Sequence, residues 1–234
     1  MPRTKMMLLT VVIVALAVPS IWAQNMRRST IERPQPNVDG SAVCIAVPIG
    51  NPPAGYYAST NKCSSGNLLQ DPPDSANGFA TTCADMGGVE ATYDQPISAV
   101  ATPAFNGWPS WRTPGTVGGT EANNPPIYAS ATSIASEIGL TLTNPQGVLG
   151  LEVSNRHTHL YTVTFHTTAG DVSQGPALVG GPGFPPNPGP RRFVAVCSGP
   201  AITGVTAQCD DCTVVNGDGD TAVAQIRGDL FKGF

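Results

Sequence analysis

The chain has 234 residues, of which only 12% are charged, while Gly (26) and Pro (23) are both abundant. So much Gly and Pro excludes a coiled coil or a helical bundle, because both need long stretches without helix breakers. A hydrophobic content of 41% can still build a core, which argues against a fully disordered chain. The formal net charge is −4 and no basic run occurs, so the composition also argues against a nucleic-acid-binding protein.

Residues 1–23 have the pattern of a secretory signal peptide. Arg3 and Lys5 precede an apolar run over Met6–Val18, and small or apolar residues lead to a cleavage point after Ala23. An uncleaved membrane anchor is the alternative interpretation. The apolar run is too short for a comfortable membrane span, which argues against it. We therefore expect a secreted protein, extracellular or in the cell envelope, with no membrane span after cleavage.

The segment 24–40 is polar and contains Pro, and we expect it to be an irregular lead-in to a single domain over 41–234. In that domain short runs rich in Val, Ile, Thr, Tyr and Phe recur, separated by turn residues. This pattern predicts an all-β fold, a jelly-roll-like antiparallel β-sandwich with long Pro/Gly-rich loops. The expected strands are Ala42–Ile49, Val89–Tyr93, Ile97–Ala101, Ile127–Ala131, Ile138–Thr143, Val148–Val153, Leu160–Thr167, Arg192–Cys197, Ile202–Ala207, Thr213–Val215 and Ala222–Ile226.

Long segments between these strands are predicted to be loops, namely Asn51–Asp74, Thr102–Pro126 and Gly180–Pro190. The last one reads GGPGFPPNPGP, which favours an extended, polyproline-like excursion. Helix-like spacing occurs only over Thr132–Ile138, for about two turns.

Six cysteines lie beyond residue 23, and an even number in an exported chain indicates three disulfides. Six cysteines allow 15 pairings, and the sequence does not choose among them. We favour three pairs, one across a loop, one local and one that ties the two ends of the domain together: Cys63–Cys83, Cys209–Cys212 and Cys44–Cys197.

Cys209-Asp-Asp-Cys212 has the spacing of a redox motif. It lies outside any βαβ pattern, and two adjacent aspartates raise rather than lower the pKa of a thiol. A structural bridge is therefore the favoured interpretation, with a metal role as the alternative. A four-cysteine zinc site would need a second matching pair, which the sequence lacks.

The C-terminal half, Ile138–Phe231, contains the segments IGLTLTNPQGVLGLEVSN, HLYTVTFHTTAGD, RRFVAVCSGPAITGVTAQC and GDTAVAQIRGDLF. In order and patterning they resemble the secreted β-sandwich domains of bacterial proteins with a PEP-CTERM sorting tail, and Tyr93–Val100 fits loosely. The resemblance implies a jelly-roll-like sandwich, similar to a carbohydrate-binding module, of extracellular or envelope location. It assigns no catalytic residue. The Pro-Glu-Pro tail of that family is missing, so we expect no anchoring through such a tail.

His157-x-His159 would place two imidazoles on one face of a strand, a spacing that suits metal ligation. His166 has the opposite parity and would join them only through a bulge or a fold-back. A cupin-type metal site would also need a Glu shortly after His159, where the chain has Val163 and Thr164. Exposed histidines on a strand or turn are the simpler interpretation.

The acidic loop Cys209–Asp220 reads CDDCTVVNGDGD. Its oxygen-bearing side chains suit Ca²⁺, which is the candidate cofactor of the chain. The same residues also suit a tight turn between strands. The candidate ligands are Asn216, Asp218 and Asp220, with Asp210 and Asp211 added if the Cys209–Cys212 bridge folds them inward.

Trp108-Pro-Ser-Trp111 is the candidate recognition surface. Two indoles in a Pro/Gly-rich loop can stack on sugar rings or fill a pocket of a partner. Tyr56 and Tyr57 lie in another long loop and are candidates to join them. Alternatively, the tryptophans plug one end of the sandwich.

The sequence lacks the signatures of common enzymes, including a nucleophile elbow, a phosphate loop, a dinucleotide fingerprint and a His-Glu-x-x-His motif. The leading hypothesis is therefore a secreted, non-catalytic binding or matrix-associated module for a polysaccharide or another envelope or matrix component. The second is a structural, self-assembling extracellular subunit, because low charge and many strands suit edge-strand pairing. The third is a hydrolase of unknown type.

Overall fold

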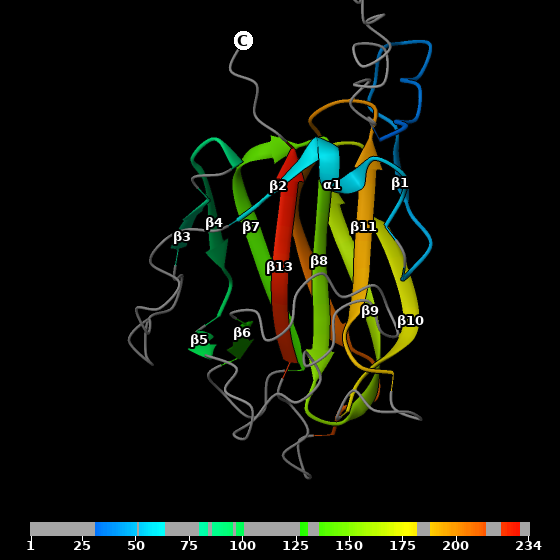
Figure 1. Ribbon diagram of the computed structural model, residues 1–234. Helices are drawn as coiled ribbons and strands as arrows, with labels where there is room; N and C mark the ends of the chain where they lie inside the picture. The colour runs from blue at the N-terminus through cyan, green and yellow to red at the C-terminus, as the bar shows by residue number, and fades with distance from the viewer. Residues whose placement is uncertain are drawn as a thin grey trace, which may run out of the picture.

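The computed structural model describes residues 31–50, 52–63, 80–83, 86–95, 97–100, 127–130, 136–181, 188–213 and 221–229. These residues form two antiparallel sheets with almost no helix (Figure 1). The predicted all-β, jelly-roll-like sandwich is confirmed. The expected signal peptide lies outside the described residues, and within them no helix is long and apolar enough to cross a membrane.

One sheet has seven described strands. Six of them follow one another in the order β1 (Cys44–Ala46), β11 (Arg191–Cys197), β8 (Val148–Asn155), β13 (Thr221–Asp229), β6 (Ile127–Ser130) and β5 (Ile97–Val100). The seventh, β2 (Thr60–Lys62), pairs with the C-terminal end of β13. The other sheet has six described strands in the order β10 (Val172–Gly180), β9 (Thr158–Thr167), β12 (Ile202–Cys209), β7 (Glu137–Gln146), β4 (Val89–Tyr93) and β3 (Ala80–Cys83).

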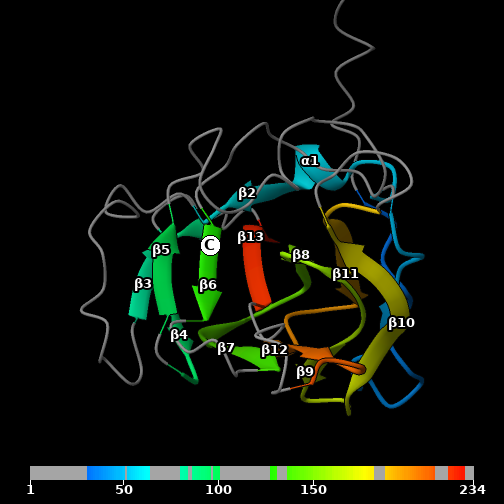
Figure 2. The ribbon, with the colours of Figure 1, turned by 90° about the horizontal axis from the view of Figure 1, so that it is seen from below.

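The chain passes repeatedly from one sheet to the other, as it does in jelly rolls. β7 lies in the six-stranded sheet, β8 in the seven-stranded sheet, β9 and β10 in the six-stranded sheet again, and β11, β12 and β13 alternate. Figure 2 shows the two layers edge-on, with the short helix α1 (Tyr56–Ser59) on the outer side of the seven-stranded sheet. The core fills the space between the layers.

Strand periodicity explains that core. Successive side chains of a strand point to opposite faces, so every second residue of β8 and β9 points inward. The inward residues of both strands are apolar and at most 2% exposed, and they are Leu149, Leu151 and Val153 of β8 and Tyr161, Val163 and Phe165 of β9.

The three disulfides join the favoured pairs. Cys44–Cys197 links β1 to β11 at the edge of the seven-stranded sheet, and Cys63–Cys83 links the end of β2 to β3 in the other sheet. Cys209–Cys212 closes the turn after β12. Three disulfides are typical of proteins in an oxidising, extracellular-type compartment.

Several local expectations need correction. The helix expected over Thr132–Ile138 is wrong at its described end, because Glu137 and Ile138 begin β7. The strand expected over Thr213–Val215 is wrong at Thr213, which lies outside any strand. The predicted loop Asn51–Asp74 contains α1 and β2, and no strand was predicted where β10 lies.

Candidate functional site

The seven-stranded sheet is buried on both faces around β8, all of whose residues are buried. The core-facing residues alternate with outward residues that lie beneath the N-terminal segment and α1. A second apolar cluster forms on this outer face, and it consists of Ile31, Tyr56, Val148, Val194 and Val196, with Val47 packed against it. This outer face, unlike an ordinary solvated sheet surface, is therefore built to hold side chains in fixed positions.

A fully buried ion pair lies on the same face. Arg192 of β11 pairs with Glu152 of β8, and neither side chain is exposed. Arg192 also donates a hydrogen bond to the hydroxyl of Tyr56 at 3.3 Å. Burial alone would lower the pKa of Arg192, but its interactions with Tyr56, Glu152 and Tyr57 raise that pKa above the usual value. The guanidinium is therefore charged, and Glu152 supplies the opposite charge that burial requires.

Tyr56 is packed into this face rather than presented at the surface. Its residue is 1% exposed, and its ring lies directly over Gly150 of β8, where the Cβ of any other residue would collide with the hydroxyl. Gly55, at φ 79°, immediately precedes α1. The chain turns there so that Tyr56 packs against the sheet and Tyr57 faces solvent. The expectation that Tyr56 contributes an exposed ring to a ligand surface is therefore corrected.

Tyr57 is 45% exposed and its ring is held by neighbouring cations. The guanidinium carbons of Arg227 and Arg192 lie 5.1 and 5.6 Å from the ring centroid, distances at which cation–π attraction operates. Tyr56 packs edge-on against the ring, with 5.3 Å between centroids. We call Tyr56, Tyr57, Lys62, Arg192 and Arg227 the tyrosine–arginine cluster.

A β-bulge in β13 puts Arg227 on the outer face. The register against β8 shifts between Ala224 and Arg227, and Gln225 has a φ of 50°. The extra residue reverses the alternation, so that Ile226 enters the core and Arg227 points outward. Arg227 then donates to the carbonyl oxygen of Thr60 at 2.8 Å and lies opposite Lys62 in the register with β2.

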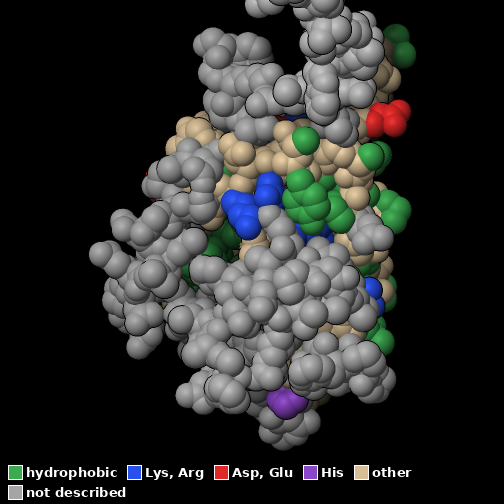
Figure 3. All heavy atoms as spheres, viewed as in Figure 1, with side chains coloured by type: hydrophobic (Ala, Val, Ile, Leu, Met, Phe, Trp, Pro, Cys, Tyr) green, Lys and Arg blue, Asp and Glu red, His purple; other side chains and the backbone are tan. Residues whose placement is uncertain are grey.

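The tyrosine–arginine cluster thus combines a half-exposed aromatic ring with basic groups from three strands. Figure 3 shows hydrophobic and basic side chains side by side on this face of the molecule, below the position of α1 in Figure 1. Trp108 and Trp111, the predicted platform, lie outside the described residues.

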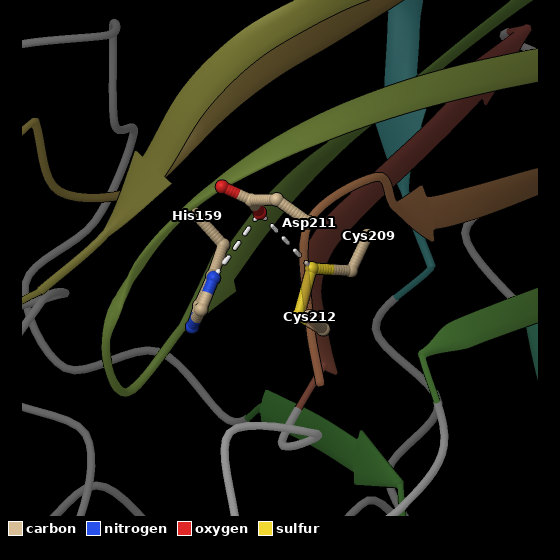
Figure 4. A group of neighbouring side chains, drawn as sticks. All are labelled: His159, Cys209, Asp211 and Cys212. Atoms are coloured by element: carbon tan, nitrogen blue, oxygen red, sulfur yellow. Dashed lines mark hydrogen bonds and ion pairs between the residues drawn. A yellow bond between two sulfur atoms is a disulfide. The ribbon is translucent and has the colours of Figure 1, made fainter. Parts of the chain in front are cut away.

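The second cluster surrounds the Cys209–Cys212 bridge. The ligand atoms of His159, Cys209, Asp211 and Cys212 lie within 4.8 Å of one another. Asp211 turns toward His159, whereas Asp210 accepts a hydrogen bond from Thr162 at 2.9 Å. Figure 4 shows Asp211 beside both His159 and a sulfur of the bridge.

The other calcium candidates, Asn216, Asp218 and Asp220, lie outside the described residues, so the calcium site stays a prediction. The histidine pair is only partly as expected. β9 begins at Thr158, which leaves His157 in the preceding turn, where its N–H donates to Asn155 at 2.9 Å. The two rings lie edge-on, with 6.4 Å between centroids, and only His159 belongs to the second cluster.

His166 takes part in a hydrogen-bonded chain on the outer face of the six-stranded sheet. Its Nδ1 is 3.2 Å from Asp171 and its Nε2 is 2.9 Å from the hydroxyl of Thr206. The order hydroxyl, imidazole, carboxylate is that of a hydrolase triad. However, Thr206 lies on β12, which pairs with strands on both sides, so its backbone N–H belongs to the sheet and is not available as an oxyanion donor. The arrangement gives no support to the hydrolase hypothesis.

Sequence reasoning missed Arg192, Glu152 and Arg227. A signal for the first two was present, because each is a charged residue within an otherwise apolar strand run, LGLEV and RRFVAV. Two charges of opposite sign in two buried strands indicate a pair. Arg227 had no such signal, because its orientation depends on the bulge.

No protein-family model matches the chain, and no curated protein matches it at a significant level. Among solved structures, the chain is similar to CBM29_1, a family 29 carbohydrate-binding module from Piromyces equi. The identity is 11% and the TM-score 0.25, over 60% of this chain and 91% of that one. A similarity of that size carries no conclusion about ligand or activity, and the resemblance to PEP-CTERM-type exported domains stays a prediction.

Proposed function

We propose that the protein is a secreted, non-catalytic binding module for a polysaccharide of the envelope or extracellular matrix, and that Tyr57, Lys62 and Arg227 of the tyrosine–arginine cluster contact the ligand. The observation that carries the proposal is the half-exposed ring of Tyr57, with the guanidinium carbons of Arg192 and Arg227 within 5.6 Å of its centroid. The signal-peptide pattern and the three disulfides support export.

Because the neighbours of Tyr57 restrain its ring, the ring suits a ligand that forms only weak contacts with the protein. Ordering a side chain on binding costs free energy, and a ring already restrained by its neighbours avoids much of that cost. An aromatic ring contacts the C–H face of a sugar, while adjacent guanidinium and ammonium groups donate to its oxygens. Tyr57 is the aromatic ring of this surface, and Arg227 and Lys62 are its guanidinium and ammonium groups.

The charge of the cluster favours an acidic polysaccharide. Lys62 and Arg227 occupy directly opposite positions on β2 and β13, where like charges are mutually unfavourable. The chain as a whole carries a net charge of −4, so this is a local basic patch on an acidic protein. A uronate carboxylate or a sulfate carries the charge opposite to both cations, and it is therefore the ligand group that we infer.

The test is retention of the oxidised, mature protein on immobilised polysaccharides, with and without calcium. We expect retention on polygalacturonate or alginate to exceed that on cellulose or xylan, and to weaken as salt is raised. Tyr57→Ala and Arg227→Gln should each weaken retention by at least about tenfold. Arg156→Gln removes one positive charge from an exposed turn elsewhere and is the matched control.

Different outcomes of this experiment test the location of the binding site and the binding function itself. Retention lost in Trp108→Ala/Trp111→Ala but kept in Tyr57→Ala, with both proteins folded, would move the platform to the tryptophan loop. Absence of retention on every polysaccharide would reject the glycan-binding function itself.

A self-assembling subunit is the second candidate, because two exposed apolar side chains lie on neighbouring edge strands. Ile45 on β1 and Leu178 on β10 are 45% and 49% exposed, and each strand ends its sheet. Light scattering over a range of concentrations tests this candidate. A strict monomer at high concentration rejects it, whereas oligomers that dissociate in Ile45→Ser/Leu178→Ser support it.

A further inference from the structure

The cluster at the Cys209–Cys212 bridge brings together four potential metal ligands from two strands. His159 comes from β9, Cys209 ends β12, and Asp211 and Cys212 lie in the turn that follows (Figure 4). Asp211 lies between the two cysteines in sequence, and His159 lies on the neighbouring strand. These two residues thus supply the second pair of ligands that a four-ligand site needs.

Two of the separations between ligand atoms lie near those of a tetrahedral zinc site. Metal–ligand distances of 2.0–2.3 Å give tetrahedron edges of about 3.3–3.8 Å. Nδ1 of His159 is 3.1 Å from Oδ1 of Asp211, and that oxygen is 3.7 Å from Sγ of Cys209. A disulfide sulfur carries no proton, so the second contact is not a hydrogen bond. It places a carboxylate oxygen beside the sulfur at the separation that two ligands of one metal require.

We propose that, when the Cys209–Cys212 bridge is reduced, Cys209, Cys212, His159 and Asp211 bind one Zn²⁺ ion, so that the bridge and the metal are alternative occupants of one site. A dithiol reductant supplies two electrons and two protons, which convert the bridge to two thiols while the dithiol becomes a cyclic disulfide. Zinc binding then releases both thiol protons. Two thiolates, one carboxylate and one neutral imidazole hold the ion.

The donor set selects the metal. Thiolate and imidazole ligands suit Zn²⁺, whereas Ca²⁺ requires oxygen ligands. Nδ1 of His159 faces Oδ1 of Asp211 and becomes the ligand, which moves the ring proton to Nε2. The contact of Nδ1 with Asp211 is then replaced by shared binding of the metal, and Nε2, which is buried without a hydrogen-bond partner among the described residues, carries the proton.

The surrounding backbone holds the ligands without the bridge. The N–H of Leu160 donates to Oδ1 of Asp211 at 2.9 Å, and the N–H of Asp210 donates to the carbonyl of Leu160 at 2.8 Å. Asn155 Nδ2 lies 3.8 Å from Sγ of Cys212, in position to donate to a thiolate. Such outer contacts orient metal ligands, and they remain when the sulfurs separate.

The experiment titrates Co²⁺ and Zn²⁺ into the native protein before and after mild reduction. Mass spectrometry of alkylated samples verifies that two thiols are free. We expect one metal per chain in the reduced protein, with the thiolate-to-cobalt absorption bands of a tetrahedral site, and none in the oxidised protein. Zinc should also slow the alkylation of both thiols by at least tenfold.

Neighbouring residues offer matched controls. His159→Ala and Asp211→Asn should weaken zinc binding more than about tenfold. His157→Ala and Asp210→Asn change the same residue types next to the cluster and should leave the affinity unchanged. The variant Cys212→His removes the bridge without any reductant, and it should bind one zinc even if the other disulfides are the first to be reduced.

Two results would overturn the inference. One is a reduced protein and a Cys212→His variant that both bind no metal. The other is equal weakening by His157→Ala and His159→Ala.

Discussion

Arg192 and Glu152 form an ion pair on the outer face of the seven-stranded sheet in which neither side chain is exposed to solvent. Removal of one partner leaves a buried charge without compensation, which costs about 3–5 kcal/mol. We therefore expect Arg192→Met and Glu152→Gln each to lower the free energy of unfolding strongly. Urea denaturation measures the effect.

The double variant Arg192→Met/Glu152→Gln provides the internal control for that pair. It removes both charges, so it should be more stable than Arg192→Met alone. A double variant that loses the sum of the two single effects would contradict a coupled pair.

Gly150→Ala should displace Tyr56. The added Cβ meets the tyrosine hydroxyl on a face where the ring is packed, and overpacking of this kind costs about 1–3 kcal/mol. Gly199→Ala is the matched control, because its Cβ meets nothing within 4 Å. Thermal unfolding should show a clear loss for the first variant and almost none for the second. If Gly150→Ala is as stable as the parent, Tyr56 is not held as described.

The three disulfides should differ in their contribution to stability. The cysteines are separated by 153, 20 and 3 positions in Cys44–Cys197, Cys63–Cys83 and Cys209–Cys212. The chain-entropy model assigns them about 5, 3 and 2 kcal/mol. Paired Cys→Ser variants, compared by urea unfolding, should be destabilised in that order, and a reversed order would reject the entropic explanation.

The calcium prediction is tested on the oxidised protein, where the bridge keeps Cys209 and Cys212 from binding metal. If Asn216, Asp218 and Asp220 bind Ca²⁺, added calcium raises the melting temperature and a chelator lowers it. Asp218→Asn should abolish that response, while Asp210→Asn should not, because Asp210 accepts from Thr162. No change with chelator removes calcium from the account of this protein.

More of the fold than of the candidate site could be predicted from the sequence. Alternating apolar residues located most strands, because burial on one face imposes a period of two. β10 escaped prediction because Gly175-Pro176 interrupts it, and Pro is tolerated there only since β10 is an edge strand with a bulge. In the same way, no local signal shows that Gln225 bulges and turns Arg227 outward.

The candidate sites depend on contacts between distant segments, which a single sequence does not reveal. Tyr57 and Arg227 are 170 positions apart in number, yet the guanidinium lies over the ring. His159 and Asp211 meet only because β9 and β12 are neighbours. The cysteine pairs were the exception, because a choice of one local pair and one loop pair leaves only Cys44 and Cys197 to form the third.

The position of β13 has a consequence for biosynthesis. It lies between β8 and β6 and also pairs with β2, although it is the last described strand of the chain. Until it emerges from the ribosome, β8 and β6 have unpaired edges, which are sites for misassembly. A nascent chain must therefore be kept from aggregating until synthesis has passed Asp229, and truncation before Thr221 would leave β8 and β6 without the strand that joins them.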